Sequence, residues 1–200
     1  MFLCSNLVYQ TKVWYNIVMT SFLNPAEVIN LLPLKEGMTV ADFGCGNGYF
    51  TLEMAKRLKP SGRIIALDIW KPSLEALDFR SKLEGLNSLI ETRWANLEMP
   101  KGSGLDDNSC NLVFIANILF EVEKKETLIE EAKRILKPEG FLVLIEWEPD
   151  KLPNKNFLFP IAKQEALELL EKFSFQIERE LSLSITHYGF LTKLTTKLSS

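Results

Sequence analysis

The stretch Asp42-Phe43-Gly44-Cys45-Gly46-Asn47-Gly48 follows a short apolar run and precedes a segment with helical spacing that begins at Tyr49. Its three glycines have no side chain, so the backbone can turn sharply there and lie close to a ligand. The spacing is Gly-x-Gly-x-Gly, whereas the dinucleotide fingerprint is Gly-x-Gly-x-x-Gly, which disfavours a nicotinamide-dependent oxidoreductase. We therefore predict a strand, a ligand-binding loop and a helix in this order.

Strands and helices alternate on both sides of this loop. Apolar runs predict strands over 39–43, 63–69, 89–94, 111–116 and 141–147, and helical spacing predicts helices over 25–32, 49–58, 72–84, 128–136 and 161–173. Pro138 and Gly140 are expected to end the helix before the strand over 141–147. Residues 175–183 alternate apolar and polar side chains and lead into a hairpin. The pattern predicts an α/β fold with a doubly wound, Rossmann-like, mainly parallel sheet.

The composition fits one globular domain. The chain has 200 residues, of which 46% are hydrophobic and 24% charged. Residues 1–18 are expected to form an arm or extended start and 19–200 the domain, with a linker-like stretch at 148–156. No apolar run near the start has the length of a membrane span or the flanks of a secretory signal. A net charge of -3 makes nucleic acid an unlikely partner.

The three cysteines, Cys4, Cys45 and Cys110, are odd in number and far apart. They form neither a CxxC pair nor a cluster with histidine, so the sequence predicts no disulfide framework and no metal site. A reducing, cytoplasmic compartment fits this pattern best. Cys45, inside the glycine loop, is expected to act as a small packing residue.

Asp68 is expected at the end of the second strand, twenty residues after Gly48. Ligands of open α/β sheets bind outside the carboxyl ends of the strands, near the point where the strand order reverses. A carboxylate in this position can accept both hydroxyl groups of a ribose. The loop and Asp68 together predict a nucleoside site.

These residues resemble the class I S-adenosylmethionine-dependent methyltransferases, in particular the ubiquinone/menaquinone C-methyltransferases and arsenite methyltransferase-like proteins. The similarity covers roughly residues 20–195, and four blocks carry it: 40–48, 66–68, 107–121 and 134–140. The resemblance implies a seven-stranded sheet whose last strand is antiparallel. It also implies S-adenosylmethionine as the cofactor and a small molecule as the methyl acceptor.

The resemblance further implies which residues contact the cofactor. The methionine part would lie against Asp42, Gly44, Cys45, Gly46 and Gly48, the ribose against Asp68, the adenine against Ile69 or Trp70 with Asn96 and Leu97, and the methyl group beside Asn117. The chain departs from the family at Asn96, where relatives usually have an aspartate. Asn96 can still form a hydrogen bond with adenine, but in a register shifted by one residue Ala95 takes this position. A second departure is Phe120, where relatives often have a histidine before Glu121.

No residue stands out as catalytic. Methyl transfer from a sulfonium needs mainly the alignment of two reactants, and only a carbon acid or phenol also needs a base. Glu121, Glu146 and His187 are the candidates for a base. Glu146 and Trp147 end a strand, where they either contact the substrate or face solvent. His187 is expected to satisfy backbone groups of a hairpin, as loop histidines often do.

Two other functions remain open at this point. An arsenite substrate is disfavoured because the cysteines lack the arrangement that would hold arsenic. The alternative from another class is a catalytically inert adenosyl-nucleoside-binding module or a regulatory partner subunit, which the changes at Asn96 and Phe120 suggest. Nothing in the sequence indicates an oligomeric state or identifies the acceptor.

Overall fold

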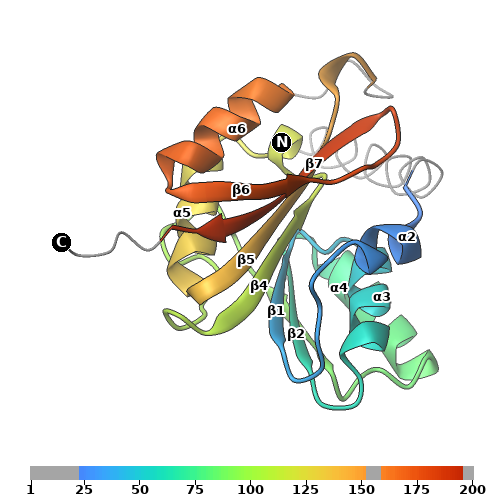
Figure 1. Cartoon of the computed structure of the whole chain (residues 1–200). Coiled ribbons are helices and arrows are strands. Elements are labelled where there is room, and N and C mark those ends of the chain that lie inside the picture. Colours follow the sequence, from blue (N-terminus) through green and yellow to red (C-terminus); the bar gives the residue numbers. More distant parts are fainter. Residues whose placement is uncertain (1–22, 152–158, 196–200) are drawn as a thin grey trace, which may run out of the picture.

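Seven strands form one sheet in the order β3-β2-β1-β4-β5-β7-β6 in the computed structural model, which describes residues 23–151 and 159–195 (Figure 1). The strands are β1 Thr39–Phe43, β2 Arg63–Asp68, β3 Ile90–Trp94, β4 Cys110–Ala116, β5 Leu136–Trp147, β6 Phe175–Glu180 and β7 His187–Leu194. The first five pair in parallel, and β7 pairs antiparallel with both β5 and β6. The predicted mainly parallel sheet with an antiparallel end is confirmed. The predicted arm at 1–18 and part of the linker at 148–156 lie outside the described residues.

Helices cover both faces of the sheet, as the alternating pattern predicted. They are α2 Pro25–Asn30, α3 Tyr49–Leu58, α4 Lys71–Leu83, α5 Lys125–Ile135 and α6 Lys163–Lys172, with two short 3-10 helices, η1 Leu119–Glu121 and η2 Pro149–Lys151. One hydrophobic cluster joins α2, α3 and α4 to one face, and a second joins α5 and α6 to the other (Figure 1). Among the described residues, no helix combines the length and the apolar character needed to cross a bilayer.

The start of α2 follows the local signals in its sequence. The Asn24 side chain accepts a hydrogen bond from the Ala26 N–H at 3.1 Å and donates one to Glu27 at 2.9 Å, while Pro25 occupies the first helical position. An asparagine cap and a proline at this position satisfy the N–H groups that a helix start leaves without partners. These local interactions fix where α2 begins.

One boundary differs from the sequence prediction. β5 begins at Leu136, so Pro138 and Gly140 lie inside this strand and do not end a helix before it. The reason is tertiary: Leu136 is buried and pairs with Cys110 before the register shifts to Phe141 opposite Leu112. The extra residues on β5 form an irregularity in the ladder, which accommodates the proline and the positive φ of Glu139.

The order of the strands reverses between β1 and β4. The chain runs outward from β1 through β2 to β3, and then returns to the other side of β1 to form β4 and β5. The loops after β1 and β4 therefore leave the sheet in opposite directions and open a crevice at its carboxyl edge. This is the edge at which the glycine loop and Asp68 were predicted to meet.

A buried carboxylate fixes the segment after β4. Glu146, near the end of β5, is only 1% exposed, and its two oxygens accept hydrogen bonds from the N–H groups of Leu119 at 2.9 Å and Trp147 at 2.8 Å. Leu119 begins η1, whose first N–H groups have no partner within the helix. Burial raises the pKa of Glu146 to about 8, and the nearby charge of Glu121 acts in the same direction. The hydrogen bonds that Glu146 accepts from backbone N–H groups lower this pKa.

We expect Gly48→Ala to destabilise the fold by roughly 2–4 kcal/mol. Gly48 precedes α3 with a φ of 78°, and a Cβ there would lie 2.2 Å from the Cδ1 of Leu77, which is fully buried. Gly85 is the matched control, because it has a φ of 64° with nothing within 4 Å of the added Cβ. Gly85→Ala should cost only the backbone term, about 1–2 kcal/mol. Urea unfolding of both variants measures the difference, and equal losses would contradict the steric argument.

The pKa of Glu146 also predicts a pH dependence of stability. Between its ordinary value of 4.5 and its native value of about 8, the folded state keeps a proton that the unfolded state has released. The free energy of unfolding therefore falls as the pH rises through this window, by up to about 1.4 kcal/mol per pH unit for one proton. Glu146→Gln removes this proton, so its stability should fall less steeply than that of the unchanged protein.

Urea unfolding at pH 5.5, 6.5 and 7.5, chosen to lie in that window at about one-unit intervals, compares the slopes. Glu126→Gln, at an exposed position of α5, is the control for the loss of a carboxylate. Parallel pH profiles for Glu146→Gln and the unchanged protein would show that Glu146 does not keep its proton in the native state.

Candidate functional site

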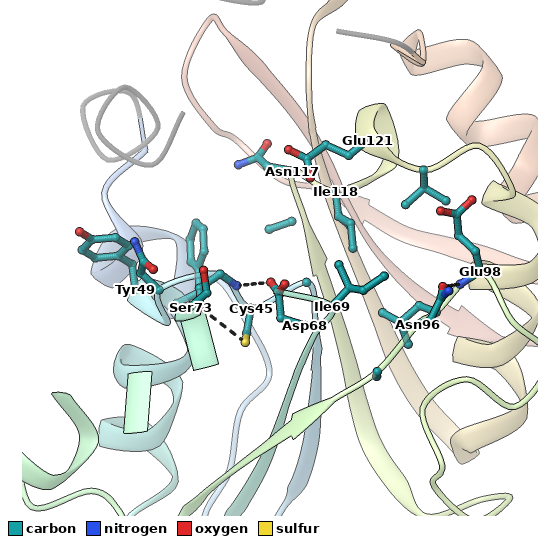
Figure 2. Close-up of a pocket in the computed structure, with 18 of the residues that line it drawn as sticks. Cys45, Tyr49, Asp68, Ile69, Ser73, Asn96, Glu98, Asn117, Ile118 and Glu121 are labelled. Atoms are coloured by element: carbon teal, nitrogen blue, oxygen red, sulfur yellow. Dashed lines mark hydrogen bonds between the residues drawn. The ribbon is translucent and has the colours of Figure 1, made fainter. Parts of the chain in front are cut away.

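A pocket opens at the carboxyl edge of β1, β2, β3 and β4 (Figure 2). Its walls come from five parts of the chain: Leu23 and Pro25; Gly44, Cys45, Gly46, Asn47, Tyr49 and Phe50; Asp68, Ile69 and Ser73; Ala95, Asn96, Leu97 and Glu98; and Ala116, Asn117, Ile118, Glu121 and Val122. The position is the switch point of the sheet, where ligands of such folds bind. Four strand ends therefore contribute to one site, although they are far apart in the sequence.

The glycine loop and Asp68 are joined directly. The N–H of Gly46 donates a hydrogen bond to Oδ2 of Asp68 at 2.9 Å, and Oδ1 of Asp68 accepts the N–H of Trp70 at 2.7 Å. The N–H groups of Gly44 and Cys45 donate to the carbonyl oxygen of Leu67 at 2.8 and 3.0 Å. Asp68, 6% exposed, thus holds the loop against the end of β2 while its side chain lines the pocket.

Asp68 can hold the loop and bind a ligand at the same time. An ionised carboxylate has roughly four acceptor sites on its two oxygens. Figure 2 shows the Asp68 side chain between the loop and Ile69, facing the open part of the pocket. The bare backbone of the loop and the Asp68 carboxylate therefore share one cleft, and the binding of a nucleoside there stays a prediction.

The segment after β3 forms one end of the pocket. Ala95 donates its N–H to the carbonyl oxygen of Asp68 at 3.0 Å, and Oδ1 of Asn96 accepts the N–H of Glu98 at 3.1 Å. Ala95, Asn96 and Leu97 all line the pocket, so both registers considered for adenine put a residue on its wall. Ile69 lines the pocket as well, whereas its alternative Trp70 is not among the residues of the wall.

The segment after β4 forms the opposite side. Asn117 has a φ of 57° and donates its N–H to the carbonyl oxygen of Ile145 at 2.9 Å. This left-handed residue turns the chain out of β4, so that Asn117, Ile118 and Glu121 line the pocket. Figure 2 shows the side chains of Asn117 and Glu121 close together at this side.

Two residues of the predicted cofactor set, Asp42 and Gly48, do not line the pocket. Asp42 is 3% exposed, and its Oδ2 accepts a hydrogen bond of 2.5 Å from the hydroxyl group of Thr51 in α3. Burial raises the pKa of Asp42 to about 7, the bond from Thr51 lowers it, and the charge of Asp68 raises it. Neither Asp42 nor Gly48 is part of the pocket wall, and the predicted contact of each with the methionine part stays a prediction.

The three candidate bases are separated by the fold. Glu121 lines the pocket, whereas Glu146 and His187 do not. Glu146 and Trp147 were expected at a strand end that faces substrate or solvent, but both are buried, because η1 covers the end of β5 and β7 pairs along it. Of the three, only Glu121 is placed to meet a substrate in this pocket.

His187 lies in a structural environment away from the pocket. It begins β7, opposite Trp147, and its ring centroid lies 4.0 Å from the Trp147 ring. Its Nδ1 lies 2.9 Å from the hydroxyl oxygen of Thr186 and 3.4 Å from that of Ser184, so its contacts are with side chains and not with the backbone groups of a turn. Burial lowers the pKa of His187 to about 4, which keeps the ring neutral at physiological pH.

Several pocket residues were not predicted from the sequence. Tyr49 and Phe50 directly follow the glycine loop, and Ser73 lies in the first turn of α4 after Asp68, so closeness to the motifs is a signal that could have identified them. Leu23 and Pro25 carry no such signal, because their place depends on how α2 packs against α3.

Comparisons with known proteins agree with this geometry. A family model described as a methyltransferase domain matches residues 34–183, well over half of the chain. A curated relative, the demethylmenaquinone methyltransferase of Lactobacillus johnsonii, is 25% identical over 170 residues, which cover 84% of this chain and 65% of the relative. The chain thus spans less than two thirds of this relative's length.

Solved structures share the fold. A SAM dependent methyltransferase from Aquifex aeolicus superposes with a TM-score of 0.75 at 24% identity, covering 88% of this chain and 92% of the other. The cyclase SpnF superposes with a TM-score of 0.74 at 15% identity, covering 86% and 80%. At these identities the likeness concerns the fold alone, and the fold by itself does not fix a reaction.

The family match and the seven-stranded sheet lead to one conclusion. The predicted resemblance to class I S-adenosylmethionine-dependent methyltransferases is confirmed, and the chain belongs to the methyltransferase domain family.

Proposed function

We propose that this chain transfers a methyl group from S-adenosylmethionine to a small-molecule acceptor. The hydrogen bond from Gly46 to Asp68 is the observation that carries the proposal, because it joins a bare stretch of backbone to a carboxylate inside one pocket. In the proposed complex Asp68 accepts the ribose hydroxyls, and the loop 44–46 with Asn117 contacts the methionine part. The adenine lies between Ile69 and the segment 95–97.

Methyl transfer from S-adenosylmethionine requires the protein mainly to align the donor with the acceptor. S-adenosylmethionine supplies an activated methyl group, whose bond to sulfur breaks as the bond to the acceptor forms, with the electron pair remaining on sulfur. The loop and Asp68 orient the donor, and the apolar side chains of Phe50 and Ile118 on the pocket wall exclude water. Such alignment can lower the barrier by about 7–11 kcal/mol.

The charges of the pocket favour a neutral or cationic acceptor. Asp68, Glu98 and Glu121 line it, and none of the described lining residues is lysine, arginine or histidine. On the acceptor wall 117–122 the charged lining residue is Glu121, so an acceptor with a phosphate or carboxylate would meet like charge there. The lining also includes the apolar residues Leu23, Phe50 and Val122, which suits an acceptor with an apolar body.

We propose an aromatic alcohol of the quinol type as the acceptor. The curated relative from Lactobacillus johnsonii is named for a demethylated menaquinone, a molecule with an apolar body. Glu121 then takes the proton of the hydroxyl group, and the electron pair of the resulting phenolate drives attack of a ring carbon on the methyl group. The ring carbon then loses its own proton to solvent while the oxygen takes back the proton held by Glu121, which restores the aromatic alcohol and the free base. The cytoplasmic location expected from the cysteines stays a prediction.

We expect Asp68→Ala to weaken binding of S-adenosylmethionine by about 1.5–3 kcal/mol, the scale of a lost charge-assisted hydrogen bond. Asp78→Ala removes an exposed carboxylate of α4 that pairs with Lys82, and it should leave the affinity unchanged. Isothermal titration calorimetry with S-adenosylmethionine, S-adenosylhomocysteine and NAD measures the affinities, and circular dichroism checks folding. An unaltered dissociation constant in folded Asp68→Ala, or binding of NAD alone, would refute the assignment.

Glu121→Gln should lower kcat for a reduced naphthoquinol acceptor by about 10²–10⁴-fold, the usual contribution of a general base. The KM for S-adenosylmethionine should stay nearly constant, because Glu121 lies on the acceptor side. Glu123→Gln, two residues further and outside the pocket wall, is the matched control. Transfer of a labelled methyl group provides the rates. Binding of S-adenosylmethionine without transfer to any acceptor of a metabolite panel would instead support the inert binding module.

A further inference from the structure

The two sides of the pocket belong to strands that do not touch. The segment after β3, which includes Asn96, lies next to the predicted adenine position, and the segment 117–122 after β4 forms the acceptor wall. β2 and β1 lie between β3 and β4 in the sheet, so no strand pairing joins these segments. Within the chain, contacts between these segments come from side chains and from the loop that connects β3 to β4.

Glu98 provides one such contact. Its Oε2 accepts hydrogen bonds from the N–H groups of Glu123 at 3.1 Å and Lys124 at 2.9 Å. Lys124 is the residue that caps α5, so the carboxylate satisfies N–H groups at the helix start and lies at the positive end of its dipole. Glu98 itself lines the pocket, and its own N–H is held by the Asn96 side chain.

A second contact fixes the far end of the same loop to α5. The backbone N–H and the hydroxyl group of Ser103 both donate to Oε1 of Glu131, at 3.1 and 2.5 Å, and Arg134 pairs with this carboxylate at 2.8 Å. Ser103 and Glu131 are both buried. This contact holds the body of the loop in place, so Glu98 is the tether next to the pocket.

We propose that Glu98 is a positioning residue that couples occupancy of the adenosine side of the pocket to the order of the acceptor wall, 117–122. The proposal rests on the proposed function, because it assumes that an adenosyl group contacts Asn96 and Leu97. A ligand that holds the turn of Asn96 also holds the Glu98 carboxylate, which in turn fixes the start of α5. Glu121 and Val122 directly precede this helix start, so the acceptor wall becomes ordered once the donor is bound.

Coupling of this kind has a thermodynamic consequence. If the adenosyl ligand stabilises the acceptor wall, an ordered acceptor wall strengthens adenosyl binding by the same factor. The effect needs no change in the average structure. A ligand that reduces local unfolding of the segment 95–98 can also reduce local unfolding of the acceptor wall 117–122, because Glu98 connects the two. Amide hydrogen exchange measures such opening segment by segment, and it requires no knowledge of the acceptor.

The experiment compares exchange with and without S-adenosylhomocysteine in the unchanged chain and in Glu98→Ala, Glu98→Asp and Glu98→Gln. In the unchanged chain the ligand should slow exchange both at 95–98 and at 119–126. Glu98→Ala removes the hydrogen-bond acceptor, and Glu98→Asp shortens the side chain that carries it. In both variants protection should persist at 95–98 and disappear at 119–126. Glu98→Gln keeps an acceptor of the same reach and should retain part of the protection.

Without ligand, Glu98→Ala should speed exchange of the Glu123 and Lys124 amides about tenfold, the scale of a lost helix cap. Glu126→Ala, which removes an exposed carboxylate from the first turn of α5 that pairs with Lys172, is the matched control and should keep the ligand-induced protection. If Glu98→Ala does not fold, the same exchange measurement on Glu98→Asp tests the proposal.

The results separate the two levels of the proposal. Protection at 119–126 that survives in Glu98→Ala or Glu98→Asp would overturn the coupling role of Glu98 while leaving the adenosyl pocket intact. An unchanged chain in which the ligand protects neither segment would instead overturn the proposed function.

Discussion

The site depends on the hydrogen bond between the Gly46 backbone and the Asp68 carboxylate. It joins the loop after β1 to the end of β2, two neighbouring parallel strands, and it brings a stretch of bare main chain beside a charged acceptor. A glycine-rich loop favours this conformation, because the loop uses positive φ values at Gly44, Gly46 and Gly48, which glycine adopts without strain. The remaining pocket walls are arranged around this pair by the sheet.

Buried or bridging carboxylates hold the other walls. Asp42 joins β1 to α3 through Thr51, Glu146 caps η1, and Glu98 caps α5 from the opposite side of the pocket. A carboxyl group is an effective support, because its two oxygens can accept hydrogen bonds from donors that a loop or a helix start leaves without partners. The same residue type thus serves as support around the pocket and as the proposed ligand-binding group within it.

Much of the fold was predictable from local signals. The alternation of strands and helices, the cap at Asn24, the glycine loop and the place of Asp68 all follow from residues close together in the sequence, and the structure agrees with each. The start of β5 was not predictable, because it depends on the pairing of Leu136 with Cys110, which are 26 residues apart.

The site was predictable in part, for the same reason. Glu146 and His187 have the chemistry of a base, but tertiary contacts keep both out of the pocket: η1 covers Glu146, and His187 is buried against Trp147 of β5. Glu98 has no motif, since its role arises from bonds to backbone groups 25 and 26 residues further along the chain. Sequence patterns identify residues whose role depends on their neighbours in the sequence. The roles of Glu98, Glu146 and His187 depend instead on tertiary contacts.

We expect one adenosyl group to contact both the Gly46 backbone and the residues at the ends of β2 and β3. The most direct test is a titration of isotope-labelled protein with S-adenosylhomocysteine, followed through backbone amide resonances. The largest shifts should occur at Gly46, Ile69 and Asn96, and they should saturate together at one dissociation constant. Shifts confined to another surface, with the Gly46 resonance unmoved at saturation, would contradict it.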